Sequence, residues 1–253
     1  MPSRISINSE NLKKIFPDVY RDFFAKCSIV CSSPKNATWA GEQTVRIGGL
    51  VVRQPLPIRT YVGLAPRTND KEIKVAGCLS YDPLEQNFRD EYIDEYQKTG
   101  IEEEMAIFFK EVCNLEIDCG FDIYILTELP FDHALGGVGS LFSPLLTVFF
   151  LYYNIITIKE LRSWTLSKTA DLINNPEKKF DFVFRAIWKW EVYNYSISSG
   201  TNPFSALLPS TTPILYFSSK KNCLPEKLGQ KIKNNKLKVD DLKYIDEMIY
   251  WGA

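Results

Sequence analysis

The sequence predicts a protein of mixed α and β structure, because strand-like and helix-like patterns occupy different parts of the 253-residue chain. The first third is rich in β-branched residues between turn signals, which favours a sheet. The middle carries apolar residues at helical spacing, interrupted by the apolar run Phe121–Leu126, which is typical of a strand. We therefore expect a sheet from the first third and helices from the middle.

An N-terminal helix is expected over Glu10–Lys26, with Ser9 as its N-cap. Apolar residues recur there at helical spacing: Leu12, Ile15, Phe16, Val19, Phe23 and Phe24. Strand-like segments follow, namely Ser28–Ser32, Gln43–Arg53 and a hairpin of Ile58–Leu64 and Glu72–Ala76 around the turn Pro66–Asp70. This part of the chain is thus predicted to be mostly sheet.

Helices dominate the middle of the chain. The first is expected over Asp90–Val112, with a buried face of Met105, Ile107, Phe108 and Phe109. The elements expected after the strand Phe121–Leu126 are an apolar helix ending near Ile158, a helix over residues 158–172, a helix over Phe180–Tyr195, a strand at Pro213–Ser218 and two short amphipathic helices within Leu224–Tyr250.

The charge balance gives no electrostatic reason to expect nucleic acid or an anionic membrane as a partner, because 30 basic residues stand against 31 acidic ones. The N-terminus lacks the apolar core of a signal peptide. The longest apolar run, Leu145–Ile158, is short for a membrane span. A soluble cytoplasmic protein with a small-molecule partner is predicted, and its oligomeric state is left open.

The cysteines and the single histidine argue against a zinc site. No CxxC pair occurs among Cys27, Cys31, Cys78, Cys113, Cys119 and Cys223. We expect these thiols to be reduced and mostly buried. A Ser-His-Asp triad built on His133 is conceivable, but only the presence of the histidine supports it.

A glycine-rich turn separates the strand Phe121–Leu126 from the apolar run Leu145–Tyr153. Its members are Gly136, Gly137, Val138, Gly139 and Ser140. Glycine lets a ligand approach backbone N–H groups closely, and a helix N-terminus directs its unpaired N–H groups to the same place. The order strand, glycine turn, helix therefore predicts a phosphate-binding loop, with an ordinary turn as the alternative.

Three segments have a motif-like composition in a fixed order. The first begins at Ser33 and carries Pro34, Gly41, Glu42, Gly48, Arg59, Tyr61 and Val62. The second is Leu126–Ser140, and the third places Glu191 ahead of Ser199, Gly200 and Asn202. Together they resemble the motifs of the GHMP kinases, the superfamily of galactokinase, homoserine kinase, mevalonate kinase and phosphomevalonate kinase. The resemblance covers about residues 29–214.

The resemblance implies an α+β fold. Residues 1–206 would form the ATP-binding domain, similar to domain 2 of ribosomal protein S5, with a mostly antiparallel sheet backed by helices. Residues 207–253 would begin a ferredoxin-like C-terminal domain. The family's third glycine motif is not found between Leu215 and Ala253. We therefore expect either a truncated chain or a partial, reduced second domain.

The resemblance also implies ATP and Mg²⁺ as cofactors and a phosphotransferase that acts on a hydroxyl of a sugar or sugar-like substrate. The residues Gly136, Gly137, Val138, Gly139 and Ser140 would bind the ATP phosphates. Glu191 with Ser140 would hold Mg²⁺, Asn202 would orient the acceptor hydroxyl at the catalytic position, and Glu42 and Gln43 would bind the substrate. The alternatives are a solvated hairpin carboxylate for Glu42 and a surface glutamate for Glu191. The hydroxyl on Mg²⁺ could also come from Ser143 in place of Ser140, or be lost.

Three positions depart from the family pattern. Asn36 replaces the usual Lys or Arg, with Lys35 just before it; Leu141 replaces a second hydroxyl residue; and Asn202 replaces an aspartate. An amide cannot take a proton from a hydroxyl, although it can orient one. Two hypotheses follow: a working kinase, or a degenerate kinase-like protein that binds nucleotide or a partner without phosphoryl transfer.

Overall fold

The computed structural model describes residues 7–41, 49–90, 101–130, 135, 137–164, 178–195, 198, 200–207, 214–218 and 250–252. The strands are β1 (Ile29–Ala40), β2 (Leu50–Arg67), β3 (Ile73–Asp82), β4 (Asn87–Asp90), β5 (Gly120–Thr127), β6 (Ile214–Ser218) and β7 (Tyr250–Gly252). The helices are α1 (Ser9–Ile15), α2 (Pro17–Lys26), α4 (Ile101–Cys113), α5 (Gly137–Tyr152), α6 (Ile158–Ser163), α8 (Lys178–Tyr195) and α9 (Thr201–Leu207).

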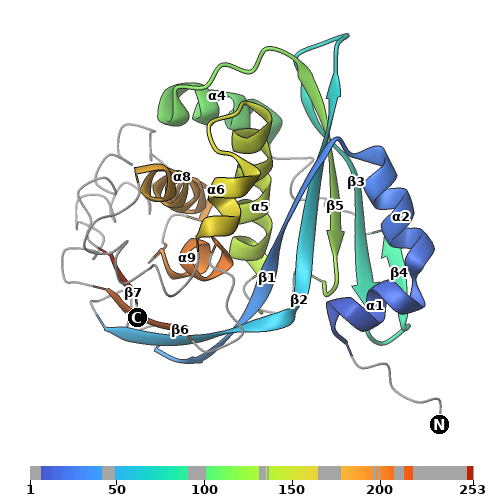
Figure 1. The fold of residues 1–253 in the computed structure, drawn as a ribbon, viewed down its shortest axis with the longest axis vertical. Helices are drawn as coiled ribbons and strands as arrows, with labels where there is room; N and C mark the ends of the chain where they lie inside the picture. The colour runs from blue at the N-terminus through green and yellow to red at the C-terminus, as the bar shows by residue number, and fades with distance from the viewer. Residues whose placement is uncertain are drawn as a thin grey trace.

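The strands form one mixed seven-stranded sheet in the order β4-β3-β5-β2-β6-β7, with β1 paired to β2. Helices cover both faces of the sheet. Figure 1 shows α1 and α2 on one face and α4, α5, α6, α8 and α9 on the other. The predicted mixed α and β class is confirmed, and β6 and β7 continue the sheet beyond β2.

The single N-terminal helix that the sequence predicts is in fact two helices. Pro17 starts α2, because proline cannot donate a hydrogen bond to continue α1 but fits the first turn of a new helix. The N-cap of α1 is Asn8 rather than Ser9, since its side chain accepts the Asn11 N–H at 2.9 Å. Ser9 instead donates its hydroxyl to the Glu128 carboxylate.

Glu128 fixes this helix pair to the sheet. Its buried carboxylate also accepts the Tyr20 hydroxyl at 2.7 Å and the Arg59 N–H at 2.6 Å. Burial, together with the neighbouring Glu128, raises the pKa of Tyr20 above its ordinary value. The phenol therefore remains a donor, and α2 is held to the sheet by a charge-assisted hydrogen bond.

The predicted hairpin of Ile58–Leu64 and Glu72–Ala76 is wrong. Both segments are strands of the sheet, but β5 lies between β2 and β3. β5 is antiparallel to β2 and parallel to β3. Turn residues predict a reversal of the chain, whereas the partner of each strand depends on packing with segments that are distant in sequence.

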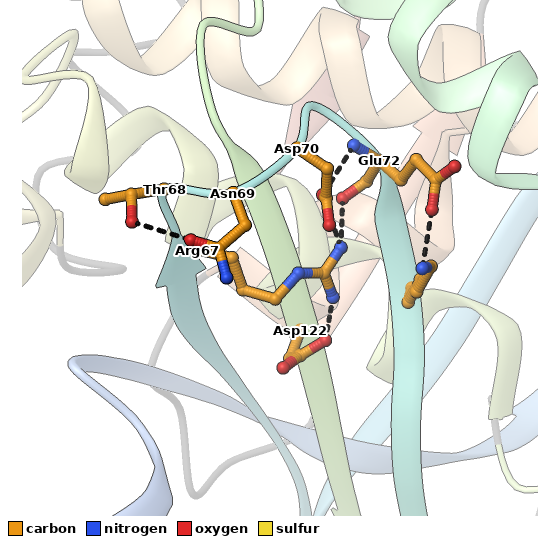
Figure 2. Close-up of polar contacts among 7 residues, drawn as sticks. Arg67, Thr68, Asn69, Asp70, Glu72 and Asp122 are labelled. Carbon is orange, nitrogen blue, oxygen red and sulfur yellow. Dashed lines mark hydrogen bonds and ion pairs between the residues drawn. The ribbon is translucent and has the colours of Figure 1, made fainter.

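Figure 2 shows the polar contacts around the segment that connects β2 to β3. Arg67 donates from Nη1 to Asp122 of β5, and from Nη2 to Asp70 Oδ1 and the Glu72 carbonyl, both at 2.8 Å. Asp70 Oδ1 also accepts the Glu72 N–H at 3.0 Å. One guanidinium thus joins β2, β5 and the segment that enters β3.

Replacing Arg67 with alanine is expected to lower the melting temperature by a few degrees, because three segments lose a shared donor. Arg67 holds the pKa of Asp70 below its ordinary value, so this contribution is present at neutral pH and is lost as the pH falls through the folded-state pKa of Asp70. Thermal unfolding of wild type and variant at neutral pH and at about pH 2 measures the effect. An equal difference at both pH values would contradict it.

The main core lies between the sheet and α4, α5 and α8. Every residue of α5 from Gly139 to Leu151 is buried, and α8 contributes the buried indoles of Trp188 and Trp190. This confirms the apolar helix predicted after the glycine turn. The helix ends at Tyr152 instead of near Ile158, and Asn154 follows with a φ of 56°.

Other predicted boundaries shift. The strand Ser28–Ser32 extends to Ala40 as β1, and Asp90 ends β4 instead of starting a helix. The expected strand at Pro213–Ser218 is confirmed as β6. The two helices expected within Leu224–Tyr250 lie outside the described residues, apart from Tyr250 itself, which is in β7.

The described cysteines are thiols and form no disulfide with one another. Cys31, Cys78 and Cys113 are buried, as predicted, whereas Cys27 and Cys119 are partly exposed. Burial raises the pKa of Cys31 and of Cys113 to about 12. Of the helices described here, none is long and apolar enough to cross a membrane.

Candidate functional site

The second and third predicted motifs meet where α5 and α9 begin. A Cβ added at Gly139 would lie 2.5 Å from Asn202 Cβ and 3.1 Å from the Asn202 carbonyl carbon. No side chain fits between the two backbones without displacing one of them. The first motif also reaches this place, because the Asn36 N–H of β1 donates to the Leu135 carbonyl at 3.1 Å.

The Asn202 amide is held at both ends. Its Nδ2 donates to Glu191 Oε1 at 2.6 Å, and its Oδ1 accepts a hydrogen bond from Arg53 Nη1. A guanidinium only donates and a carboxylate only accepts, so these neighbours fix the orientation of the amide. An aspartate here would face Glu191 with a second carboxylate, and two carboxylates at that distance do not both ionise readily.

Glu191 lies on α8 with only 3% of its surface exposed, so it is not a surface glutamate. Its second oxygen accepts the Ser198 hydroxyl, and Ser198 Oγ accepts the Gly200 N–H at 3.1 Å. Gly200 has a φ of 78°, and an added Cβ would lie 2.9 Å from the Trp188 ring. The tight turn at Gly200 therefore brings α9 back onto α8, which places Asn202 against Glu191.

Arg53 contacts the predicted site residue Asn202 but was not itself predicted from the sequence. It is buried in β2 and lies opposite Thr38 of β1, while Asn36 lies opposite Pro55. Paired residues, and residues two apart on a strand, project from the same face of a sheet. Arg53 therefore projects beside Asn36, where the resemblance leads us to expect a basic side chain. Arg53 lies within the first predicted motif but at none of its matched positions, so only the strand pairing identifies it.

Ser140 joins the first turn of α5 to the sheet. Its hydroxyl lies 3.3 Å from Thr60 Oγ1, and its carbonyl accepts the Ser33 hydroxyl at 2.8 Å. The carbonyl is available because Pro144, four residues later, lacks the N–H that would complete the helical hydrogen bond. The start of α5 is thus fixed to both β1 and β2.

Two further polar residues of β1 are buried near this turn. Lys35 is 1% exposed and lies at an irregularity in the pairing of β1 with β2. The Asn36 side chain donates to the Pro34 carbonyl at 3.3 Å, and its buried Oδ1 has no hydrogen-bond donor within the described part of the chain. An unsatisfied buried acceptor is costly, so a donor from a ligand or water suits this position.

The remaining predicted site residues are only partly described. Gly137 and Val138 form the first turn of α5. Gly136, Glu42, Gln43 and Ser199 lie outside the described residues, as does His133. Among the residues that the structure does describe, no group of three His, Cys, Asp or Glu side chains could hold a metal ion by itself.

Replacing Arg53 with methionine is expected to lower the free energy of unfolding by about 1–3 kcal/mol, because the half-buried Asn202 oxygen loses its charged donor. Lysine at the same position should restore part of the loss, since it returns a donor and a charge. Urea unfolding of the three proteins measures the difference. If the methionine variant is as stable as wild type, the hydrogen bond between Arg53 and Asn202 contributes nothing to the free energy of unfolding.

Comparisons with known proteins give a structural match only. No protein-family profile and no curated protein matches the sequence. The structure of Streptococcus pneumoniae phosphomevalonate kinase in complex with phosphomevalonate and AMPPNP matches 89% of the chain and 58% of its own, at 15% identity and a TM-score of 0.52. The Lin0012 protein from Listeria innocua matches 88% of the chain and 56% of its own, at 13% identity and a TM-score of 0.52.

A structure of Lactococcus lactis galactokinase complexed with galactose also matches, over 83% of the chain and 49% of its own, at 19% identity and a TM-score of 0.49. The chain therefore spans between 49% and 58% of the length of these three structures. At such identities a match establishes the fold alone. The chain has a mixed α and β fold similar to that of GHMP-family kinases.

Proposed function

We propose that the chain is the ATP-binding part of a GHMP-type kinase, which transfers the γ-phosphate of ATP to a hydroxyl of a sugar or sugar-like molecule. The observation that carries the proposal is the close packing of Gly139 on Asn202, whose side chain donates a hydrogen bond to Glu191. Phosphoryl transfer depends on positioning and on neutralising charge. A helix start, a buried carboxylate and an amide beside one another are suited to these tasks.

The phosphate-binding residues in this proposal are Gly136, Gly137, Val138, Gly139 and Ser140. The backbone N–H groups in the first turn of α5 have no carbonyl of the same helix to which they can donate. The positive end of the helix dipole also lies there and favours an anion. Gly137 has no side chain that could block the approach of a ligand, whereas the missing side chain of Gly139 makes room for Asn202 of α9. Bound ATP with Mg²⁺ would supply the phosphoryl group for transfer.

Glu191 and Ser140 are the proposed magnesium ligands. Magnesium prefers hard oxygen ligands and usually takes only one or two protein carboxylates. Glu191 accepts hydrogen bonds from Asn202 and Ser198, and a carboxylate has about four lone-pair sites, more than these two hydrogen bonds require. Ser140 would have to exchange its contact with Thr60 for the metal.

Asn202 and Asn36 are suited to orienting the acceptor hydroxyl. An amide oxygen has two lone pairs, and Arg53 uses one of those on Asn202. The buried Asn36 oxygen, for which the described residues supply no donor, can accept a second hydrogen bond. Glu42 and Gln43 would contact other hydroxyls of a sugar-like substrate, as the resemblance implies.

The second candidate is a degenerate kinase-like protein that binds nucleotide or a partner without phosphoryl transfer. The observation in its favour is that Asn202 is bound at both ends and has no group that can take a proton. General-base assistance is typically worth ~10²–10⁴-fold in rate. A site without it would bind nucleotide normally but transfer slowly or not at all.

The proposal also includes a division of the chain into two domains after residue 206. Residues 1–206 would form the ATP-binding domain and residues 207–253 a partial C-terminal domain, in a protein of the cytoplasm. The described strands of the second part, β6 and β7, belong to the same sheet as β2.

Thermal shift with ATP, with and without Mg²⁺, followed by ADP release with sugars, mevalonate and homoserine, tests the proposal. A kinase is expected to be stabilised by ATP and to release ADP with at least one acceptor. Stabilisation without ADP release would favour the degenerate candidate. No stabilisation under either condition would contradict both.

A further inference from the structure

A cavity of about 480 Å³ lies between β1 and the helices α5, α6 and α9. Residues 28–34 form one wall, and Ser143, Pro144 and Thr147 of α5 form the opposite one. This volume is within the usual range for small-molecule pockets. Gly139, Arg53, Glu191 and Asn202 are absent from the described lining, whereas Ser33, Pro34 and Arg59 of the first predicted motif are part of it. The cavity therefore adjoins the site above but does not contain its central residues.

Part of the lining is apolar. It consists of aliphatic side chains of three helices, Leu151, Ile158, Leu161 and Leu207. Ile158 is 57% exposed, so a ligand in the cavity could cover apolar surface that now faces water. These side chains suit an aliphatic ligand body, which would shield them from water.

The charged groups of the lining are all of one sign. Arg59 and Arg162 line the cavity, and no aspartate or glutamate is among the described residues that do so. The Arg59 guanidinium donates from Nε and Nη2 to Ser32 Oγ and the Ser32 carbonyl, both at 2.9 Å. A guanidinium has five N–H donors, so about three remain for water or a ligand.

Ser143 supplies an independent indication of a ligand. Its side chain is 1% exposed, and its hydroxyl has no hydrogen-bond partner within the part of the chain that the structure describes. Buried hydroxyls in folded proteins nearly always have a partner. The position of Ser143 in the cavity wall makes a bound polar group the natural partner.

We infer that this cavity binds a small organic anion with an aliphatic body, such as a medium-chain carboxylate. The anionic group would lie toward Arg59 and Arg162, and the aliphatic body would lie among the leucines. Charge complementarity favours an anion, because a cation would face two guanidinium groups without a counter-charge. The inference does not depend on the proposed function.

A ligand in the cavity would affect the hydrogen bonding at the start of α5. Ser33 lines the cavity and donates its hydroxyl to the Ser140 carbonyl at 2.8 Å. An anion that displaces Ser33 would therefore also change the anchoring of the first turn of α5.

Calorimetric titration with octanoate and with octylammonium, which share an eight-carbon chain, tests the inference. Octanoate is expected to bind at least about tenfold more tightly than octylammonium. Equal binding of both probes, or no binding of octanoate, would overturn it. ATP should not displace octanoate, and displacement would make the cavity part of the nucleotide site.

Two α6 variants locate the binding. Arg162→Gln should weaken octanoate about fivefold, whereas Lys159→Gln, which removes an equal charge from the same helix but does not line the cavity, should have little effect. Ser143→Ala should retain the fold, because the buried hydroxyl it removes makes no described hydrogen bond, and should also weaken octanoate. Equal effects of the two α6 variants, or unchanged binding in Ser143→Ala, would contradict the assignment.

Discussion

Replacing Gly139 with alanine is expected to lower nucleotide affinity by at least about tenfold and the free energy of unfolding by about 1–3 kcal/mol. The added Cβ would lie 2.5 Å from Asn202 Cβ, with the Asn202 backbone only 0.6–0.7 Å further away, at 3.1 and 3.2 Å. Because backbone atoms cannot rotate aside, α5 and α9 must separate. Both the helix start and the position of Asn202 would then change.

Gly77→Ala is the matched control. A Cβ at Gly77 would lie 3.5 Å from the Tyr124 ring, which is ordinary van der Waals contact. Its stability is expected to stay within about 0.5 kcal/mol of wild type. Urea unfolding and ATP titration of both variants measure the effects. Wild-type behaviour of Gly139→Ala in both assays would show that the two helices do not meet as described.

Replacing Glu191 with glutamine is expected to abolish the effect of Mg²⁺ on ATP binding while leaving the fold nearly intact. Glutamine keeps the size of the side chain and can still accept from Asn202, while its Nε2 would donate to Ser198 Oγ instead of accepting from it, so both contacts persist without the charge. If Glu191 is a magnesium ligand, wild type should bind ATP about tenfold more tightly with Mg²⁺ than without it, and the variant should not.

Glu111→Gln, an exposed change on α4, controls for the loss of one negative charge. ATP titrations with and without Mg²⁺ compare the three proteins. A magnesium effect that persists at full size in Glu191→Gln would exclude this carboxylate as a ligand. Glu191→Ala should be less stable than wild type whether or not Glu191 binds Mg²⁺, because it leaves the half-buried Asn202 Nδ2 without its acceptor.

Residues within short motifs were the predictable part of the candidate site. Gly139, Glu191 and Asn202 each have a local sequence context that identifies them, and the structure brings the three together. Arg53 has no such context, because a β-rich segment accounts for it fully as a strand residue. Its contact with Asn202 exists only because β2 lies beside β1 and beneath α9, and no local pattern records that arrangement.

The fold has the same division between local and long-range information. The apolar helix α5 and the strand β5 were predictable from composition and periodicity. The insertion of β5 between β2 and β3 was not, since turn residues such as Pro66 define a reversal but not a partner. The proline that starts α2 is a local signal, and it was available in the sequence at Pro17.

Calorimetric titration of the wild-type protein with Mg²⁺-ATP and with adenosine tests the central claim most directly. If the start of α5 binds phosphate, ATP should bind at least about tenfold more tightly than adenosine, and Gly139→Ala should remove that difference. Adenosine binding as tightly as ATP, or no binding of ATP by the wild-type protein, would contradict a phosphate site at this helix.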